Sequence, residues 1–369
     1  MRKSINVINN VITLVVSVVL VFVSATVVNK TFGTSFGGMV LYFVVGAILS
    51  GLINAFIHEF GHLVAGKINN FAFISMTVWF FRWKKVGKKT EFSFCFIGEE
   101  SGYTEMVSVT TDDLRKRYMR MTFGGILASL VMTLISVVPF VFSKNLPEQV
   151  FAVLSVFLPI SAYYFLGNLL PMVQEGVKND GAVYFGLKKN DISSQVMMSV
   201  ASIHSELLSG KTPSEIDEKY YFDVPQLPED DLNFIMLLNA RYAYYLDKGD
   251  YENAVKVNDR LVSSDYVPKS MRAVFEADEL YGYCVINKNS EKADELMYEL
   301  DKYLNNCNNA TNIRIKMAYL INILNEKDNL LVFYKKGLRE IKKEQLKGVA
   351  LFEKKLLDGL YFGSQEQDA

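Results

Sequence analysis

Cysteine and histidine are scarce in this chain of 369 residues, which contains three of each. The cysteines (Cys95, Cys284 and Cys307) are far apart and odd in number, which argues against a disulfide framework and against a cysteine-ligated zinc site. Basic residues lie between apolar runs rather than along one face, so the pattern of a nucleic-acid-binding protein is missing. The formal net charge of -1 hides an asymmetry, because charged residues crowd the second half of the chain.

Charge is absent altogether from four long stretches. They cover residues 7–29, 31–57, 121–143 and 149–174. Each is long enough for a membrane-spanning helix, which needs about 20 apolar residues. The first stretch follows Arg2 and Lys3, as in a signal peptide, but it is longer than a usual signal core and lacks a clear small-residue cleavage site. We therefore expect it to be a retained helix.

Basic residues in the connecting segments predict the orientation in the membrane. Ten of them lie between the second and third apolar stretches, whereas the two other connections carry only Lys30 and Lys144. Cytoplasmic loops are enriched in Lys and Arg, so both termini are expected in the cytoplasm of a multi-pass protein of the cell membrane. The same orientation brings the C-terminal ends of the second and fourth helices to the cytoplasmic side.

The sequence His58-Glu59-Phe60-Gly61-His62 directly follows the second apolar stretch. Histidines four residues apart share one helix face and can bind one zinc ion, and Glu59 can take a proton from an attacking water and return one to a leaving amine. Ionisable groups cost roughly 2.5–3.5 kcal/mol at the centre of a membrane helix, so three of them in five residues indicate function. We predict a catalytic zinc site.

A catalytic zinc ion requires a third protein ligand. The remaining histidine, His204, lies in an amphipathic stretch beyond the last apolar run, and we interpret it as a solvated or hydrogen-bonded helix residue. A carboxylate is the better candidate. Asp180 follows the fourth apolar stretch and is predicted on the same side of the membrane as the two histidines, and Glu175 is the alternative.

These motifs resemble the site-2 protease family of intramembrane zinc metalloproteases. The resemblance covers residues 37–187 and rests on the HExxH motif, on the small residues 124–129, and on Asn168-Leu169-Leu170-Pro171 followed by Asn179-Asp180-Gly181. It implies that His58, His62 and Asp180 bind zinc and that Glu59 is the general base. The segment 172–178 is longer than in the commonest form of the family and resembles a bacterial branch with an Asn-Asp-Gly motif.

Asn168 precedes Pro171, which removes a backbone hydrogen bond near the predicted metal site. Its carboxamide is a candidate for binding the substrate backbone or the oxyanion, and the alternative is a hydrogen bond to a neighbouring helix. Gly124 and Gly125 are expected to allow close approach of two helices.

Two further regions lack the long apolar run of a membrane-spanning helix. Residues 71–109 alternate apolar and polar side chains, with a basic turn around Gly87, and predict a small membrane-associated sheet that either holds an extended substrate or merely plugs the site. The second half contains similar segments (around 244–254, 284–293 and 319–328) spaced by about 38–40 residues, which favours a tetratricopeptide-like helical repeat over a plain bundle.

The predicted fold is therefore an α-helical multi-pass membrane protein with a small β-sheet and a C-terminal soluble all-α repeat domain. We expect an N-terminal membrane helix (1–36), a metalloprotease core (37–189), a linker (190–231) and a cytoplasmic repeat domain (232–369). The substrates implied by the family are membrane-embedded precursor or signal peptides or anchored regulators, and the repeat domain is a candidate surface for a protein or peptide. The alternatives are a zinc protease that acts on soluble or lipidated peptides at the cytoplasmic face, and a non-catalytic membrane scaffold.

Overall fold

The computed structural model describes residues 2–33, 36–95, 102–174 and 176–366. It divides into two compact units. One unit, called here the membrane unit, comprises Met1–Lys84, Glu91–Met106 and Asp113–Ser194. The other, called the helical unit, comprises Lys85–Thr90, Val107–Asp112 and Gln195–Ala369. The chain is mostly helical with a small antiparallel sheet, as predicted.

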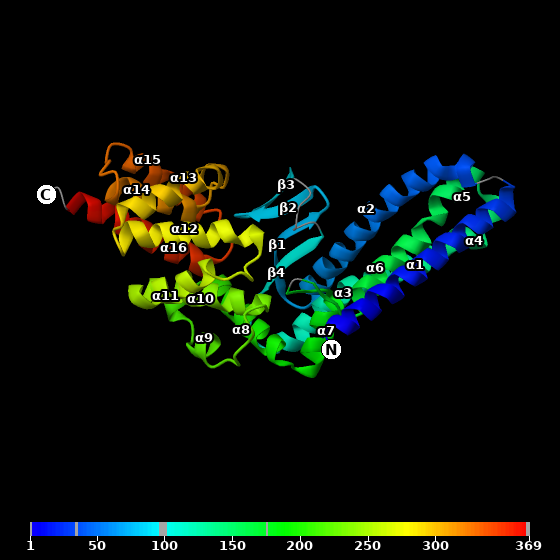
Figure 1. Ribbon diagram of the computed structural model, residues 1–369, viewed down its shortest axis with the longest axis horizontal. Helices are drawn as coiled ribbons and strands as arrows, with labels where there is room; N and C mark the ends of the chain where they lie inside the picture. Colours follow the sequence, from blue (N-terminus) through cyan, green and yellow to red (C-terminus); the bar gives the residue numbers. More distant parts are fainter. Residues whose placement is uncertain (1, 34–35, 96–101, 175, 367–369) are drawn as a thin grey trace. The chain divides into compact units, whose positions relative to one another are not determined.

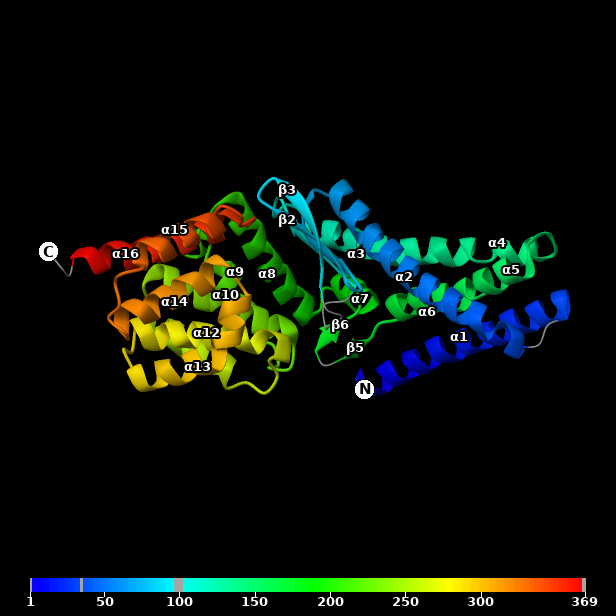
Figure 2. The same ribbon diagram turned by 90° about the horizontal axis from the view of Figure 1, so that it is seen from above.

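Four apolar spans lie in the membrane unit and correspond to the four charge-free stretches. The helices are α1 (Arg2–Phe32), α2 (Phe36–Ile68), α3 (Leu114–Ile135), α4 (Val138–Val141), α5 (Glu148–Ser155) and α6 (Phe157–Leu169). By length and composition, α1, α2, α3 with α4, and α5 with α6 can each cross a membrane. Figures 1 and 2 show α1, α2, α5 and α6 running side by side. The third span is interrupted before α4, where Pro139 occupies the start of the helix.

Glycine allows α2 and α3 to pack with their backbones in contact. A Cβ atom on Gly61 of α2 would lie 2.5 Å from the Gly124 carbonyl oxygen, and one on Gly124 of α3 would lie 2.4 Å from the Ala65 Cβ. Any larger residue at either position would push the two helices apart. The predicted role of Gly124 in close helix approach is thus confirmed, and it brings the end of α2 that carries the HExxH motif directly against α3.

The predicted sheet is present between α2 and α3. Its strands are β1 (Phe71–Val78), β2 (Phe81–Val86), β3 (Lys89–Phe94) and β4 (Tyr103–Ser108), in the order β3-β2-β1-β4. Strands β1 and β2 are antiparallel, with Ser75 opposite Lys84 and Val78 opposite Phe81. Gly87, with a φ of 58°, forms the turn between β2 and β3. Strand β4 is the outer strand on the β1 side.

After α6 the chain forms a small hairpin before the next helix. Strands β5 (Val173–Gln174) and β6 (Val177–Lys178) pair antiparallel, and α7 (Asp180–Lys189) begins directly afterwards. The helix α6 ends at Leu169 because Pro171 cannot donate a helical hydrogen bond. This hairpin therefore determines where Asp180, the first residue of α7, is placed.

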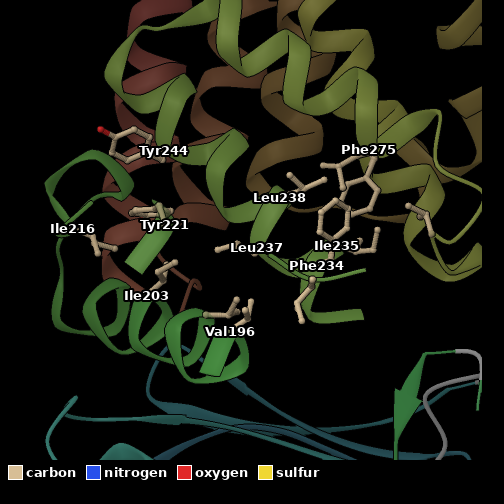
Figure 3. Packing of buried hydrophobic residues seen from close by; sticks show 14 of the residues in the cluster. Val196, Ile203, Ile216, Tyr221, Phe234, Ile235, Leu237, Leu238, Tyr244 and Phe275 are labelled. Atoms are coloured by element: carbon tan, nitrogen blue, oxygen red, sulfur yellow. The ribbon is translucent and has the colours of Figure 1, made fainter. Parts of the chain in front are cut away.

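The helical unit contains α8 (Ile192–Ser209), η2 (Pro213–Glu215) and α9 (Lys219–Phe222) before the longer C-terminal helices. Residues 190–231, predicted as a linker, are thus largely folded. Val196, Ile203 and Tyr221 are buried and pack with Phe234 and Leu238 of the next helix in one hydrophobic core, which Figure 3 shows. The apolar residues of α8 recur every three or four positions, which is the period of an amphipathic helix.

Three helix pairs follow. They are α10 (Leu232–Lys248) with α11 (Tyr251–Val262), α12 (Lys269–Val285) with α13 (Ser290–Asn306), and α14 (Ala310–Asn322) with α15 (Leu330–Ile341), and α16 (Lys347–Glu366) completes the unit. Each of the three similar sequence segments covers the turn within one pair. Gly249, Lys288 and Asn325, at intervals of 39 and 37 residues, all have positive φ there. The identification of these pairs as tetratricopeptide-type repeats remains a prediction.

Candidate metal centre

His58 and His62 lie one turn apart near the C-terminal end of α2, and Asp180 approaches them from the start of α7. The two Nε2 atoms are 3.2 Å apart. The Asp180 Oδ2 atom lies 3.0 Å from each of them. All three side chains are largely buried. The structure thus brings together the three residues that the sequence proposed as metal ligands, from two helices more than 110 positions apart in the chain.

Helix α3 fixes the orientation of both imidazole rings. His58 Nδ1 lies 3.1 Å from the Gly125 carbonyl oxygen and 2.9 Å from Ser129 Oγ. His62 Nδ1 lies 3.1 Å from the Met121 carbonyl oxygen. A carbonyl oxygen can only accept, so each Nδ1 carries the hydrogen and each neutral ring presents the lone pair of its Nε2. Such second bonds are typical of metal-ligating histidines.

The three converging atoms fit a zinc ion. Two imidazole lone pairs and a carboxylate oxygen meet with no hydrogen between them, and Asp180 Oδ2 is buried without a hydrogen-bond donor. Such an arrangement is repulsive unless a cation occupies the centre. With zinc bonds of about 2.1 Å, two ligands of a tetrahedron lie about 3.4 Å apart, close to the distances found here. Two nitrogens and one carboxylate oxygen are also the ligand types of catalytic zinc.

Gly125 provides the space for this arrangement. A Cβ atom on Gly125 would lie 2.3 Å from His62 Nε2 and would clash with the imidazole ring. The carbonyl of the same residue accepts the hydrogen bond from His58. The sequence analysis predicted only close helix approach for Gly125, and the structure adds that its missing side chain leaves room for a ligand histidine.

The side chain of Asn179 forms hydrogen bonds with both the end of α6 and the start of α7. Its Oδ1 accepts hydrogen bonds of 2.9 Å from the backbone N–H groups of Met172 and Ala182. Its Nδ2 donates to the carbonyls of Gly167 and Leu170, at 2.6 and 2.7 Å. One side chain thus caps α7 and ties it to the helix before the hairpin. Asp180 is consequently held at the first position of α7.

Gly181 is the third member of the Asn-Asp-Gly motif. A Cβ atom at Gly181 would lie 2.3 Å from the Leu169 carbonyl oxygen and 2.9 Å from that of Asn168. A glycine is therefore required for α7 to begin against the end of α6.

Glu59 lies beside the cluster and is only 4% exposed. Thr104, at the beginning of β4, donates a 2.6 Å hydrogen bond to Glu59 Oε2. The backbone of Gly102, which has a φ of 84°, also lies close, because a Cβ atom there would be 3.7 Å from Glu59 Oε1. Strand β4 therefore fixes the carboxylate of the residue predicted to be the general base.

The other predicted residues lie outside this cluster. Asn168 donates a 2.9 Å hydrogen bond to the Tyr164 carbonyl of its own helix, and its binding of the substrate backbone or the oxyanion stays a prediction. His204 is not a member of the metal-ligand cluster found in the described residues, and burial lowers its pKa. Glu175, the alternative ligand, lies outside the residues that the structure describes.

Sequence reasoning missed Thr104, Ser129 and the structural role of Asn179. Threonine in an alternating strand and serine in an apolar helix carry no local signal, because their partners come from other elements. Asn179 had a signal, since Asn immediately before a helix is a common cap, but its bonds to α6 depend on the hairpin.

A family model described as Peptidase family M50 matches residues 46–325, about three quarters of the chain. The matched range includes His58, Glu59, His62 and Asp180. Neither the curated proteins nor the solved structures contain a match. Because the family model covers more than half of the sequence, the chain belongs to peptidase family M50, the site-2 protease family of membrane zinc metallopeptidases.

Proposed function

We propose that the protein is an intramembrane zinc endopeptidase that cuts peptide bonds in or next to membrane-spanning segments. The observation that carries this proposal is the convergence of His58 Nε2, His62 Nε2 and Asp180 Oδ2 next to a buried glutamate. His58, Glu59 and His62 lie within the span Gly37–Ile68, and Asp180 follows the span that ends at Leu169.

Each residue has a separate role in the proposed reaction. His58, His62 and Asp180 would hold a zinc ion, which would supply Lewis-acid activation of water and of the scissile carbonyl. Glu59 takes the proton of the attacking water and transfers it to the leaving amine. Thr104 keeps the Glu59 carboxylate in place through the hydrogen bond to Oε2. The hydroxyl of Ser129 and the carbonyls of Gly125 and Met121 orient the two imidazoles.

The ligand count favours catalysis over a scaffold with structural zinc. A structural zinc site is closed by four protein ligands, whereas a catalytic site keeps one position open. Among the residues that the structure describes, the cluster has three members. The scaffold alternative would require a fourth protein ligand, and the carboxylate of Glu59 beside the cluster accepts a hydrogen bond from Thr104.

The placement of β4 supports an extended, membrane-derived substrate. Proteolysis requires an extended peptide, and such peptides commonly bind by adding a strand to the edge of a sheet. Strand β4 is an outer strand of its sheet, and its Thr104 contacts Glu59. We propose that a substrate segment unwinds from its membrane helix, lies along β4 and reaches the metal centre. Small precursor or signal peptides and membrane-anchored regulators suit this route.

The remaining organisation is also part of the proposal. The positive charges flanking the spans favour a multi-pass protein of the cell membrane with both termini in the cytoplasm. The helix pairs from α10 to α15 would then form a cytoplasmic repeat domain, and such domains bind peptides or proteins on a concave surface. A cytoplasmic protein or peptide partner at this domain is consistent with the three similar turns.

The test compares wild type with Glu59→Gln in the native host, by mass spectrometry of membrane and secreted peptides. The substitution removes the proton acceptor and retains the side-chain size. We expect fragments that end inside a hydrophobic segment in wild type and none in the variant. The loss of rate should be about 10²–10⁴-fold, as for other general bases.

Glu91→Gln is the matched control, because Glu91 is exposed on β3, at the opposite edge of the sheet from β4. It should give the wild-type peptide profile. Identical profiles for wild type and Glu59→Gln, with zinc bound to both, would contradict the proposed function. If Glu59→Gln loses only products from soluble or lipidated peptides, the protein is instead a zinc protease that acts at the cytoplasmic face of the membrane.

A further inference from the structure

We infer that Asn6 and Asn9 of α1 are positioning residues of the metal centre, because they hold the segment from which Asp180 is placed. This inference rests on the proposed assignment of Asp180 as a zinc ligand. It gives α1 a role in the enzyme beyond that of a membrane anchor. The family match begins at residue 46, so α1 lies outside it.

The two asparagines bind the backbone that follows α6. Asn6 Nδ2 donates to the Val173 carbonyl at 2.5 Å, and the Val173 N–H donates to Asn6 Oδ1 at 3.2 Å. Asn9 Nδ2 donates to the Pro171 carbonyl at 2.8 Å. The carboxamide of Asn6 thus pairs with both polar groups of Val173, as a neighbouring strand would. Pro171 and Val173 lie beyond the end of α6, where no helical partner is available for their carbonyls.

A short series of bonds joins this segment to Asp180. The N–H of Met172, between the two anchored residues, donates to Asn179 Oδ1, and the Asn179 N–H donates to the Met172 carbonyl at 3.1 Å. Val173 also lies opposite Lys178 in the hairpin. The anchored segment is therefore bound directly to the residue that precedes Asp180. Movement of Pro171–Val173 away from α1 would carry Asn179, and with it the carboxylate, away from the histidines.

The hydrogen bonds of other asparagines in the apolar helices support a specific role for Asn6 and Asn9. Asn54 and Asn168 donate to carbonyls of their own helices, four residues earlier, so their N–H groups bond without involving another element. Asn6 and Asn9 instead reach across to a segment more than 160 positions away. Their spacing of three residues places both on one face of α1, and Asn9 is 9% exposed. The next asparagine, Asn10, is exposed and offers a matched control.

The experiment uses the purified full chain and the double variant Asn6→Leu/Asn9→Leu. Leucine is close to asparagine in size and favours a membrane helix, so the change removes the amides and keeps the span. Zinc affinity is measured by competition with a chelator, and the ligand geometry by the visible spectrum of the cobalt-substituted protein. Partners outside the ligand shell typically change metal affinity by 10–100-fold. We expect zinc binding at least about tenfold weaker and an altered cobalt spectrum, with Asn10→Leu unchanged.

Thermal unfolding with and without zinc separates positioning from general stability. Zinc stabilises the folded state according to its affinity. Positioning predicts that the increase in Tm caused by zinc shrinks in the double variant, whereas a purely structural role lowers both Tm values equally. The single variants Asn6→Leu and Asn9→Leu provide the same test if the double variant does not fold. The variant Asn9→Gln keeps an amide at position 9. Zinc affinity closer to wild type in Asn9→Gln than in Asn9→Leu would further support the role of the amide.

Two results would overturn the inference. Wild-type zinc affinity and an unchanged cobalt spectrum in Asn6→Leu/Asn9→Leu would show that the amides do not position the ligand. An equal fall in Tm with and without zinc would assign them a structural role. Asp180→Ala, measured in parallel, tests the underlying assignment. If Asp180→Ala still binds zinc, Asp180 is not a ligand and the inference loses its basis. If Asp180→Ala loses zinc but Asn6→Leu/Asn9→Leu does not, only the role of α1 is refuted.

Discussion

Both units of the molecule bury ionisable side chains, but they treat them differently. In the helical unit, Arg314 of α14 and Glu353 of α16 are 1% and 4% exposed. Arg314 Nε and Nη2 donate to the two oxygens of Glu353 at 2.8 and 3.3 Å, and Thr311 donates to the same carboxylate. The guanidinium also lies 4.1 Å from the centre of the Tyr281 ring. The opposite charges are thus paired within the protein.

In the membrane unit, the Asp180 Oδ2 atom of the cluster has no hydrogen-bond donor among the described residues. His58, His62 and Asp180 direct three lone pairs at one point, and the Nδ1 atoms of both histidines face α3. The difference distinguishes a structural ion pair from a binding site. The paired charges of α14 and α16 connect two helices, whereas the cluster at the end of α2 requires a cation from outside the chain.

The first prediction concerns the ion pair between Arg314 and Glu353. Replacing Arg314 by Leu should lower the free energy of unfolding of the helical unit by about 3–5 kcal/mol, because Glu353 is left buried and unpaired. The double variant Arg314→Leu/Glu353→Leu should recover most of the loss. Hydrogen–deuterium exchange of α12 and α14 in the full chain measures both. A double variant less stable than the single one would show that the pair contributes more than mutual neutralisation.

The same comparison predicts that removing one ligand from the metal cluster abolishes binding rather than folding. Asp180→Ala should weaken zinc binding by more than about 100-fold, since even partners outside the ligand shell cost 10–100-fold. Glu175→Ala should leave zinc affinity unchanged. Chelator competition on the purified variants checks both. Zinc loss in Glu175→Ala but not in Asp180→Ala would assign the third ligand to Glu175.

A smaller change separates the general base from the metal ligands. Thr104→Val removes the hydroxyl that donates to Glu59 and retains the shape of the side chain. We expect a fall in kcat of about tenfold, equivalent to about 1.4 kcal/mol in the activation free energy, with unchanged zinc content. Thr90→Val, at an exposed position of β3, is the control. A loss of zinc in Thr104→Val would mean that β4 supports the ligands rather than the base.

The last prediction concerns a second acidic group of the helical unit. Burial raises the pKa of Asp278 to about 7, with Glu353 raising it further and Arg314 opposing. The unfolded value is about 3.9. Between these values the folded state binds the additional proton, so stability should fall as the pH rises from about 4 to 7, by at most about 1.4 kcal/mol per pH unit.

Asp278→Asn should remove this pH dependence. Exchange of the α12 amides, compared between wild type and variant at each pH, measures the difference independently of the intrinsic exchange rate. A parallel pH dependence in the two proteins would show that Asp278 is not the group responsible.

Residues with a local pattern were predicted from the sequence, and residues that depend on tertiary contacts were not. The apolar runs, the alternating strands and the histidines at a spacing of four determined the spans, the sheet and the cluster face of α2. Asp180 required the added assumption that the ends of two helices meet on one side of the membrane. Residues 190–231 were predicted as a linker, and the structure shows that they include the helix α8, which contributes to a hydrophobic core.

The contacts of Thr104 and of the asparagines Asn6, Asn9 and Asn179 depend on which elements lie side by side. No periodicity reports such neighbours. One signal was available, because polar residues on one face of an apolar helix usually face protein rather than lipid, and Asn6 and Asn9 share a face of α1. It indicates an internal partner without identifying it.

The most direct test of the metal assignment is zinc X-ray absorption spectroscopy of the purified full chain. The account predicts about one zinc per chain, surrounded by nitrogen and oxygen ligands at about 2.0–2.2 Å, with two imidazoles and no sulfur. The imidazole signal should be reduced in His62→Ala, and bound zinc should be lost in Asp180→Ala. A zinc-free protein after purification and reloading, or a spectrum with sulfur ligands, would contradict the assignment of His58, His62 and Asp180 as the metal centre.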